Sequence, residues 1–245
     1  MVYNQTMGNK AATDVVFNNY AKTYKQGLTK TLKISGFSPN YFHNYKAKDL
    51  FLYLKNKNME KKPLKILDFG CGVGCSDPFL SHYFPKSTIY ACDISDESIK
   101  CAKKENAGFK NLIYSTYKDN KLPFDEKFDV IFVANVFHHI SRKMQQSTIN
   151  MLKENLVKGG MLIIFEHNPY NPATDLLALL TDYRYDKNTN LLTPAYMKKI
   201  LKNAGFNNLD VTYRIFFPGI LKIFAPYEKY LNKCPLGAHY YYIAS

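Results

Sequence analysis

The chain has 245 residues and 46% hydrophobic and 22% charged residues, so it is long enough to bury a full core and is typical of a globular protein. One domain is the default expectation at this length. Apolar runs such as Met161–Phe165 stop well short of the roughly 18 residues that a membrane-spanning helix needs. The first ten residues lack the apolar core of a signal peptide and the five cysteines follow no regular spacing, so we expect a cytoplasmic protein.

The formal net charge of +13 is concentrated at the start of the chain. Residues 1–62 carry +8, residues 63–165 carry +2 and residues 166–245 carry +3. A basic segment of this kind is compatible with an anionic partner such as a phosphate-bearing substrate, a membrane surface or RNA, although lysines on solvated helix faces explain it more simply. Its densest part, Lys55–Lys62, is interrupted by uncharged and acidic residues, so we expect no DNA partner.

From Lys65 onward, short apolar runs alternate with longer helical patterns, which is typical of a doubly wound α/β sheet. A serine cap at Ser95 predicts a helix through Ala107, and Thr193-Pro194 predicts the start of another that ends at Gly205. Further helices are expected near residues 76–83 and 143–156. The predicted strands are Lys65–Phe69, Thr88–Cys92, Leu112–Ser115, Phe128–Ala134, Met161–Glu166, Leu209–Phe216 and Tyr240–Ala244.

Residues 1–62 are expected to form a helical lid ahead of the main domain at 63–245. Within them, residues 11–57 read as two helices joined around residues 35–39, and we expect these helices over the ligand edge of the sheet. Insertions at 168–192 and 218–236 interrupt the later alternation. Ligands of such sheets sit beyond the carboxyl ends of the strands, so both insertions are predicted to help form an acceptor pocket.

The most informative segment is the strand and glycine loop from Ile66 to Gly74. Glycines there let the backbone turn sharply and approach a ligand where a side chain would collide. A dinucleotide site requires the spacing G-x-G-x-x-G, but here Cys75 occupies the position of the third glycine. A carboxylate, Asp68, also stands two residues before Gly70, which suits a ligand with an ammonium group better than a phosphate.

The pattern D-x-G-x-G-x-G resembles motif I of the class I S-adenosylmethionine-dependent methyltransferases. Three further segments resemble the same family in the expected order: the strand ending at Asp93, nineteen residues after Gly74, the stretch from Leu122 to Ile140, and the turn Lys158-Gly159-Gly160. The resemblance covers residues 65–165. It implies a Rossmann-like, mostly parallel seven-stranded sheet with an antiparallel last strand, and S-adenosylmethionine as the cofactor.

The resemblance also implies roles for individual residues. Asp68 would hold the methionine amino group, Asp93 the ribose hydroxyls, and Ile94 would pack on the adenine. An acid after the third strand often contacts the adenine amine; Lys118 lies near that place, and Asp119 could substitute. The remaining expected cofactor contacts are the loop residues Gly70, Cys71, Gly72 and Gly74, then Asn135, and Tyr24 in the N-terminal element Phe17–Tyr24, which resembles F-x-x-x-A-x-x-Y.

Methyl transfer from a sulfonium needs the acceptor atom, the methyl carbon and the sulfur in line, so positioning supplies most of the catalysis. A general base matters when the acceptor is a hydroxyl. The catalytic candidates are His139, Glu166 and His167, all at predicted carboxyl ends of strands, with His139 preferred to His138. We expect O-methylation of a small-molecule or a lipid- or carbohydrate-linked acceptor.

Two alternatives accompany this hypothesis. An RNA methyltransferase would use the same core, but no target-base motif follows the fourth strand. A non-catalytic cofactor-binding or partner protein is the second alternative. For the methyltransferase itself, residues 218–233 are a candidate for peripheral membrane contact, although an ordinary helix packed on the last two strands explains them more simply. No metal site is expected, because Cys71 and Cys75 lie within the cofactor loop and no second pair has ligand spacing.

Overall fold

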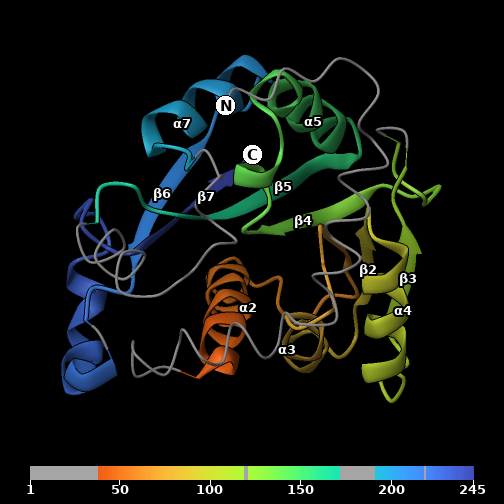
Figure 1. The fold of residues 1–245 in the computed structure, drawn as a ribbon, viewed down its shortest axis with the longest axis horizontal. Coiled ribbons are helices and arrows are strands. Elements are labelled where there is room, and N and C mark those ends of the chain that lie inside the picture. Colours follow the sequence, from red (N-terminus) through yellow and green to blue (C-terminus); the bar gives the residue numbers. More distant parts are fainter. Residues whose placement is uncertain (1–37, 119–120, 172–190, 218) are drawn as a thin grey trace, which may run out of the picture.

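The computed structural model describes residues 38–118, 121–171, 191–217 and 219–245, which form a seven-stranded sheet with helices on both faces (Figure 1). The strands are β1 (Lys65–Phe69), β2 (Thr88–Asp93), β3 (Leu112–Thr116), β4 (Phe128–Ala134), β5 (Leu156–His167), β6 (Leu209–Arg214) and β7 (His239–Ala244). The helices are α2 (Pro39–Asn56), α3 (Asp77–Tyr83), α4 (Asp96–Glu105), α5 (Arg142–Glu154) and α7 (Pro194–Asn203), with 3-10 helices η1 (Phe137–His139) and η2 (Gly219–Tyr230).

The strand order is β3-β2-β1-β4-β5-β7-β6. Only β7 is antiparallel to its neighbours, β5 and β6, so the predicted mixed sheet with an antiparallel last strand is confirmed. The chain winds outward from β1 to β3 and then returns to β4 on the other side of β1. The carboxyl ends of β1 and β4 therefore border the switch point, where ligands bind in open α/β sheets.

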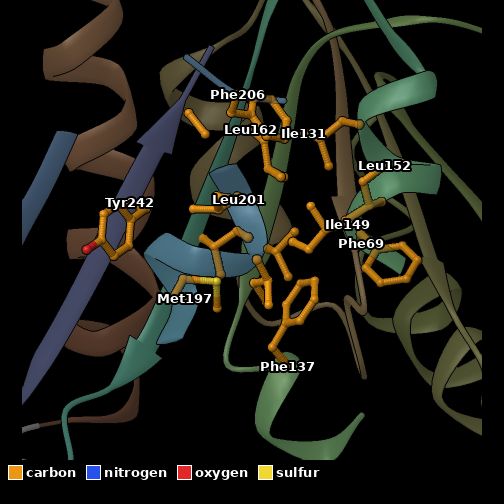
Figure 2. Packing of buried hydrophobic residues seen from close by; sticks show 14 of the residues in the cluster. Phe69, Ile131, Phe137, Ile149, Leu152, Leu162, Met197, Leu201, Phe206 and Tyr242 are labelled. Carbon is orange, nitrogen blue, oxygen red and sulfur yellow. The ribbon is translucent and has the colours of Figure 1, made fainter. Parts of the chain in front are cut away.

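Side chains along the central strands alternate between two hydrophobic cores, because helices cover both faces of the sheet. Ile66 and Phe132 face the core that includes residues of α2 and α3, whereas Leu67 and Ile131 face the core that includes residues of α5 and α7. Figure 2 shows the second core, where Ile131 lies among residues of α5 and α7. Burial on both faces explains why these strands are continuously apolar.

The described part of the predicted lid is α2. Ser38 caps it by accepting a hydrogen bond from the Tyr41 amide at 3.3 Å, and Leu50 and Leu54 are fully buried in the core shared with α3. This segment is therefore a core helix on one face of the sheet, and its N-terminal half reaches the carboxyl edge, where His43 contacts Ser76. The other expected lid helix and Tyr24 lie outside the described residues.

Two predicted strand bounds differ from the structure by more than one residue. β5 begins at Leu156, five residues before the predicted start, because Leu156 pairs with Phe128 across a register shift in the β4–β5 ladder. β6 ends at Arg214 because Ile215 has a φ of +64°. The amides of Ile215 and Phe216 then donate to the Glu228 carboxylate, at 3.4 and 2.8 Å, instead of to a neighbouring strand.

The second insertion contains η2, which is kinked at Leu221 and carries Pro226 inside. It exposes a row of large apolar side chains, namely Leu221, Ile223, Phe224, Tyr227 and Tyr230. Among the helices that the structure describes, none is both long and apolar enough to cross a bilayer.

Candidate cofactor and acceptor site

The glycine loop between β1 and α3 is closed against the end of β2. The amides of Gly70 and Cys71 both donate to the Cys92 carbonyl, at 2.8 and 3.0 Å, and the Gly74 amide donates to the Cys71 carbonyl at 3.0 Å. All three glycines of the loop have positive φ, 77°, 55° and 75° in chain order. The loop therefore adopts a backbone that favours glycine at each of these positions.

A methyl group would meet different surroundings at each glycine. At Gly70 it would lie 2.5 Å from a Val136 methyl, and at Gly74 it would lie 2.6 Å from the Asn106 side-chain nitrogen. At Gly72 it would meet no atom within 4 Å. Gly70 and Gly74 are therefore needed for close packing, whereas Gly72 borders open space at the carboxyl edge.

Asp93, at the end of β2, ties this loop to the next one. Its Oδ2 accepts from the Gly72 amide and its Oδ1 from the Ser95 amide, both at 2.9 Å. Burial raises the pKa of the Asp93 carboxyl, and these backbone hydrogen bonds oppose that effect. Each carboxylate oxygen has a second lone pair, so Asp93 can still accept hydrogen bonds from ligand hydroxyls. Ile94 follows it, half-buried.

Asp68, at the end of β1, forms a pair with Asp77 of α3, a partner that the sequence prediction missed. Both are buried, with 2% and 0% of their surface exposed, and they lie close enough for each carboxyl to affect the pKa of the other. The pKa of Asp68 is raised well above its usual value, first by burial and then by Asp77. Two buried carboxylates side by side repel each other, so the pair favours keeping one proton. The Tyr114 hydroxyl donates to Asp77 Oδ2 at 2.7 Å.

Asn135 begins the loop after β4. Its φ of +60° is a strained conformation for a residue with a side chain, and its amide donates to the Phe165 carbonyl at 2.9 Å. The Asn135 Oδ1 atom is buried and has no hydrogen-bond partner within the described ranges. A buried oxygen in this state is a ready acceptor for a ligand N–H or O–H.

His138 and Glu166 form a buried pair on the other side of the switch point. Glu166 has no exposed surface, and its two oxygens accept from the Phe137 amide at 2.8 Å and contact His138 Nδ1 at 2.6 Å. His139 stacks beside His138 with ring centroids 4.1 Å apart, and among Val136–Ile140 it is the exposed residue. Desolvation, followed by the neighbouring His138, lowers the pKa of His139 to about 3, so it is neutral at physiological pH.

The imidazoles continue as a row across the sheet edge. His167 lies 5.5 Å from His138 and 4.7 Å from His239, measured between ring centroids, and the Tyr45 hydroxyl contacts His239 Nδ1 at 2.6 Å. Burial lowers the pKa of both His167 and His239 well below the usual value. The sequence did not single out His239, because it joins this row only through the pairing of β5 with β7.

Near the expected adenine position, the structure describes Lys118 but not Asp119. Lys118, near the expected adenine position, forms an ion pair with Asp96 at 3.4 Å on the surface of α4. Asp119, and residues 172–190 of the first insertion, lie outside the described residues. In the part of the chain that is described, no three His, Cys, Asp or Glu residues are arranged to hold a metal ion.

Comparison with known proteins agrees with this geometry. Residues 67–162 match the methyltransferase domain family. Malonyl-[acyl-carrier protein] O-methyltransferase of Bacillus cereus is 30% identical over 125 residues, which are 51% of this chain and 46% of that protein. The chain thus spans about half the length of the first curated relatives that it matches.

Solved structures show the same fold. A Thermotoga maritima SAM-dependent methyltransferase, described as a possible histamine N-methyltransferase, is 14% identical, with a TM-score of 0.65 over 95% of this chain and 99% of that one. Magnesium protoporphyrin IX methyltransferase of Synechocystis, solved with bound SAH, is 16% identical, with a TM-score of 0.61 over 94% of each chain. The motifs and the family match therefore identify a methyltransferase domain at residues 67–162, and the solved S-adenosylmethionine-dependent methyltransferases share the fold of the described chain.

Proposed function

We propose that this protein transfers the methyl group of S-adenosylmethionine to an oxygen atom of a small-molecule, lipid-linked or carrier-linked acceptor. The observation that carries this proposal is a neutral imidazole, His139, next to a Glu166–His138 pair across the switch point from the glycine loop. The relative from Bacillus cereus, whose name describes an O-methyltransferase of a carrier-linked acid, supports oxygen as the acceptor atom.

The residues of the loop fit the cofactor. Gly72 borders open space, Asp93 has lone pairs left for hydroxyls, and Asn135 holds a buried oxygen without a partner among the described residues. Asp68 can give up its shared proton to pair with an ammonium group. S-adenosylmethionine supplies an electrophilic methyl group when bound, and the chain's own task is to align it with the acceptor and exclude water.

On the acceptor side, the three histidines and Glu166 take different roles. We assign His139 to accept a hydrogen bond from the acceptor hydroxyl, and the proton as the new bond forms. Glu166 has both oxygens occupied and no exposed surface, so we assign it as a positioning residue that orients His138. The His167 ring lies 5.5 Å from the His138 ring, and we assign it as an uncharged side chain that lines this edge of the sheet.

The test uses S-adenosylmethionine with a labelled methyl group and a panel of hydroxyl and carboxylic acid acceptors, with product detected by mass spectrometry. His139→Ala is expected to lower kcat for a hydroxyl acceptor about 100-fold and to leave binding of S-adenosylhomocysteine unchanged. His82→Ala, which removes an exposed imidazole of α3, is the matched control. Binding of S-adenosylhomocysteine without transfer to any acceptor would instead favour a non-catalytic role.

A further inference from the structure

Lys46 of α2 is a lysine inside the protein core. Only 2% of its surface is exposed, although its neighbour Lys48 on the same helix is exposed in the usual way. Tyr45 and Ala47 beside it are buried core residues. Lysine is rarely buried to this extent unless its charge has a partner, so the position needs an explanation.

The ammonium group of Lys46 has no such partner within the described ranges. No hydrogen bond or ion pair joins its Nζ atom to a described residue, while the neighbouring turn of α2 uses Tyr45 to bind His239 and Asp49 to bind Arg214. A buried charge is costly unless it is paired and hydrogen-bonded. The side chain is therefore arranged for an anion that is not part of the described chain.

Two carboxyl groups lie near enough to influence Lys46, but neither forms a hydrogen bond or an ion pair with it. Burial lowers the pKa of Lys46 to about 8, and Glu166 and then Asp68 partly offset this, so the ammonium form still predominates at neutral pH. Glu166 is bound to Phe137 and His138, whereas Asp68 lies beside Asp77. The other titratable groups that sense Lys46 are the imidazoles of His43, His167 and His239.

The position of Lys46 relative to these two acids indicates which anion it takes. Asp68 marks the cofactor side of the switch point and Glu166 marks the acceptor side, and the charges of both raise the pKa of Lys46. The adjacent Tyr45 contacts His239, whose ring lies 4.7 Å from that of His167, so this turn of α2 lies at the same edge. An α-amino acid carries its ammonium and carboxylate groups on the same carbon, so a site for one requires an acid and a base close together. Asp68 and Lys46 supply that combination.

We propose that Lys46 binds a carboxylate of a ligand at this edge, either that of the amino-acid end of S-adenosylmethionine or that of a carboxylic acid acceptor. This inference rests on the proposed function, since it places a group of the cofactor or the acceptor against α2. The inference gives α2, the first described helix, a direct role in ligand binding. Neither the glycine loop nor the row of histidines contains a group with this role.

The test replaces Lys46 with Met, which keeps the volume and removes the charge. Calorimetry then compares S-adenosylhomocysteine with 5′-methylthioadenosine, which lacks the amino-acid end. If the carboxylate is that of the cofactor, Lys46→Met is expected to lower the affinity for S-adenosylhomocysteine about 10-fold or more. The affinity for 5′-methylthioadenosine should stay unchanged. Lys46→Arg should restore most of the affinity, and Lys48→Met should bind both compounds as the wild type does.

If the carboxylate belongs to the acceptor, both nucleosides bind Lys46→Met normally. Malonate added to the protein saturated with S-adenosylhomocysteine then raises the melting temperature of the wild type but not of the variant. A folded Lys46→Met variant that binds all three compounds like the wild type overturns the inference while leaving the proposed function intact. Wild-type protein that binds no S-adenosylhomocysteine overturns both.

Melting of the unliganded proteins separates ligand binding from a structural role. A charge kept for a ligand destabilises the empty protein, so Lys46→Met should melt at a higher temperature than the wild type. If Lys46 instead stabilises the fold, Lys46→Met should melt at a lower temperature than the wild type. That result would also overturn the inference.

Discussion

The Nδ1 atom of His138 lies 2.6 Å from Glu166 Oε2, and this contact joins the loop after β4 to the end of β5. Both side chains are almost completely buried, at 2% and 0% exposure. A proton on Nδ1, donated to the carboxylate, leaves Nε2 of His138 as the acceptor nitrogen. The pair therefore sets the tautomer of His138 and the orientation of the ring on which His139 stacks.

Glu166→Gln should lower kcat about 10- to 100-fold without changing the affinity for S-adenosylhomocysteine. The amide keeps the size of the side chain but removes the negative charge that orients His138. The free energy of unfolding should fall by about 1–3 kcal/mol, because one of the two buried contacts is lost. Steady-state kinetics and urea unfolding measure these two effects. An unchanged kcat in a folded variant would contradict the positioning role.

Gly70→Ala and Gly72→Ala form a matched pair, because both residues have positive φ but only Gly70 is tightly packed. Gly70→Ala should lose about 2–5 kcal/mol of stability through backbone strain and collision with Val136. Gly72→Ala should lose only about 1–2 kcal/mol.

Calorimetry with S-adenosylhomocysteine completes this comparison. The new methyl group of Gly72→Ala would extend into the space that we assign to the cofactor, so binding should be lost although the protein stays folded. Normal binding by Gly72→Ala would show that the ligand does not occupy that space.

The Asp68–Asp77 pair should make stability fall as pH rises. Burial raises the pKa of both carboxyls, so the folded protein holds protons that the unfolded chain releases above its ordinary pKa of 3.8. From about pH 4 upward the folded state therefore loses stability until the pair ionises. Asp77→Asn removes one acid, so its stability relative to the wild type should increase with pH. Melting curves from pH 5 to pH 8 test this, and a constant difference would argue against a shared proton.

Asp93→Ala should weaken binding of S-adenosylhomocysteine about tenfold or more. The substitution removes the acceptor expected for the ribose hydroxyls and also frees the amides of Gly72 and Ser95. Asp96→Ala is the control, since Asp96 is an exposed acid three residues later that contacts Thr116 and Lys118. Calorimetry measures the affinity of both variants for S-adenosylhomocysteine. If the two variants bind it equally well, Asp93 is not part of the cofactor site.

Local sequence predicted the parts of the site that lie on one continuous segment. The acid, the glycine loop and the following helix are contiguous, so their spacing alone implied the turn after β1 and the side chains on it. Asp93 was found for the same reason, because it ends an apolar run just ahead of a serine cap at Ser95. The alternation of strands and helices along the chain could also be predicted, because strands that are buried on both faces are continuously apolar.

The contacts that define the acceptor side depend on pairings between distant segments. Tyr45 and His239 are 194 residues apart, and they meet only because α2 packs on the sheet and β7 inserts between β5 and β6. No local pattern distinguishes Lys46 from the exposed lysines around it, since its burial follows from which face of α2 meets the core.

The amino-acid order by itself therefore determined the alternation of elements, the glycine loop and the methyltransferase motifs, because each is encoded in residues that are neighbours along the chain. Only the tertiary structure decided that His138 and not His139 contacts Glu166, that Asp68 lies beside Asp77, and that Lys46 is buried. The physical reason is that charge and hydrogen bonding depend on distance and desolvation, which arise only when separate segments pack together.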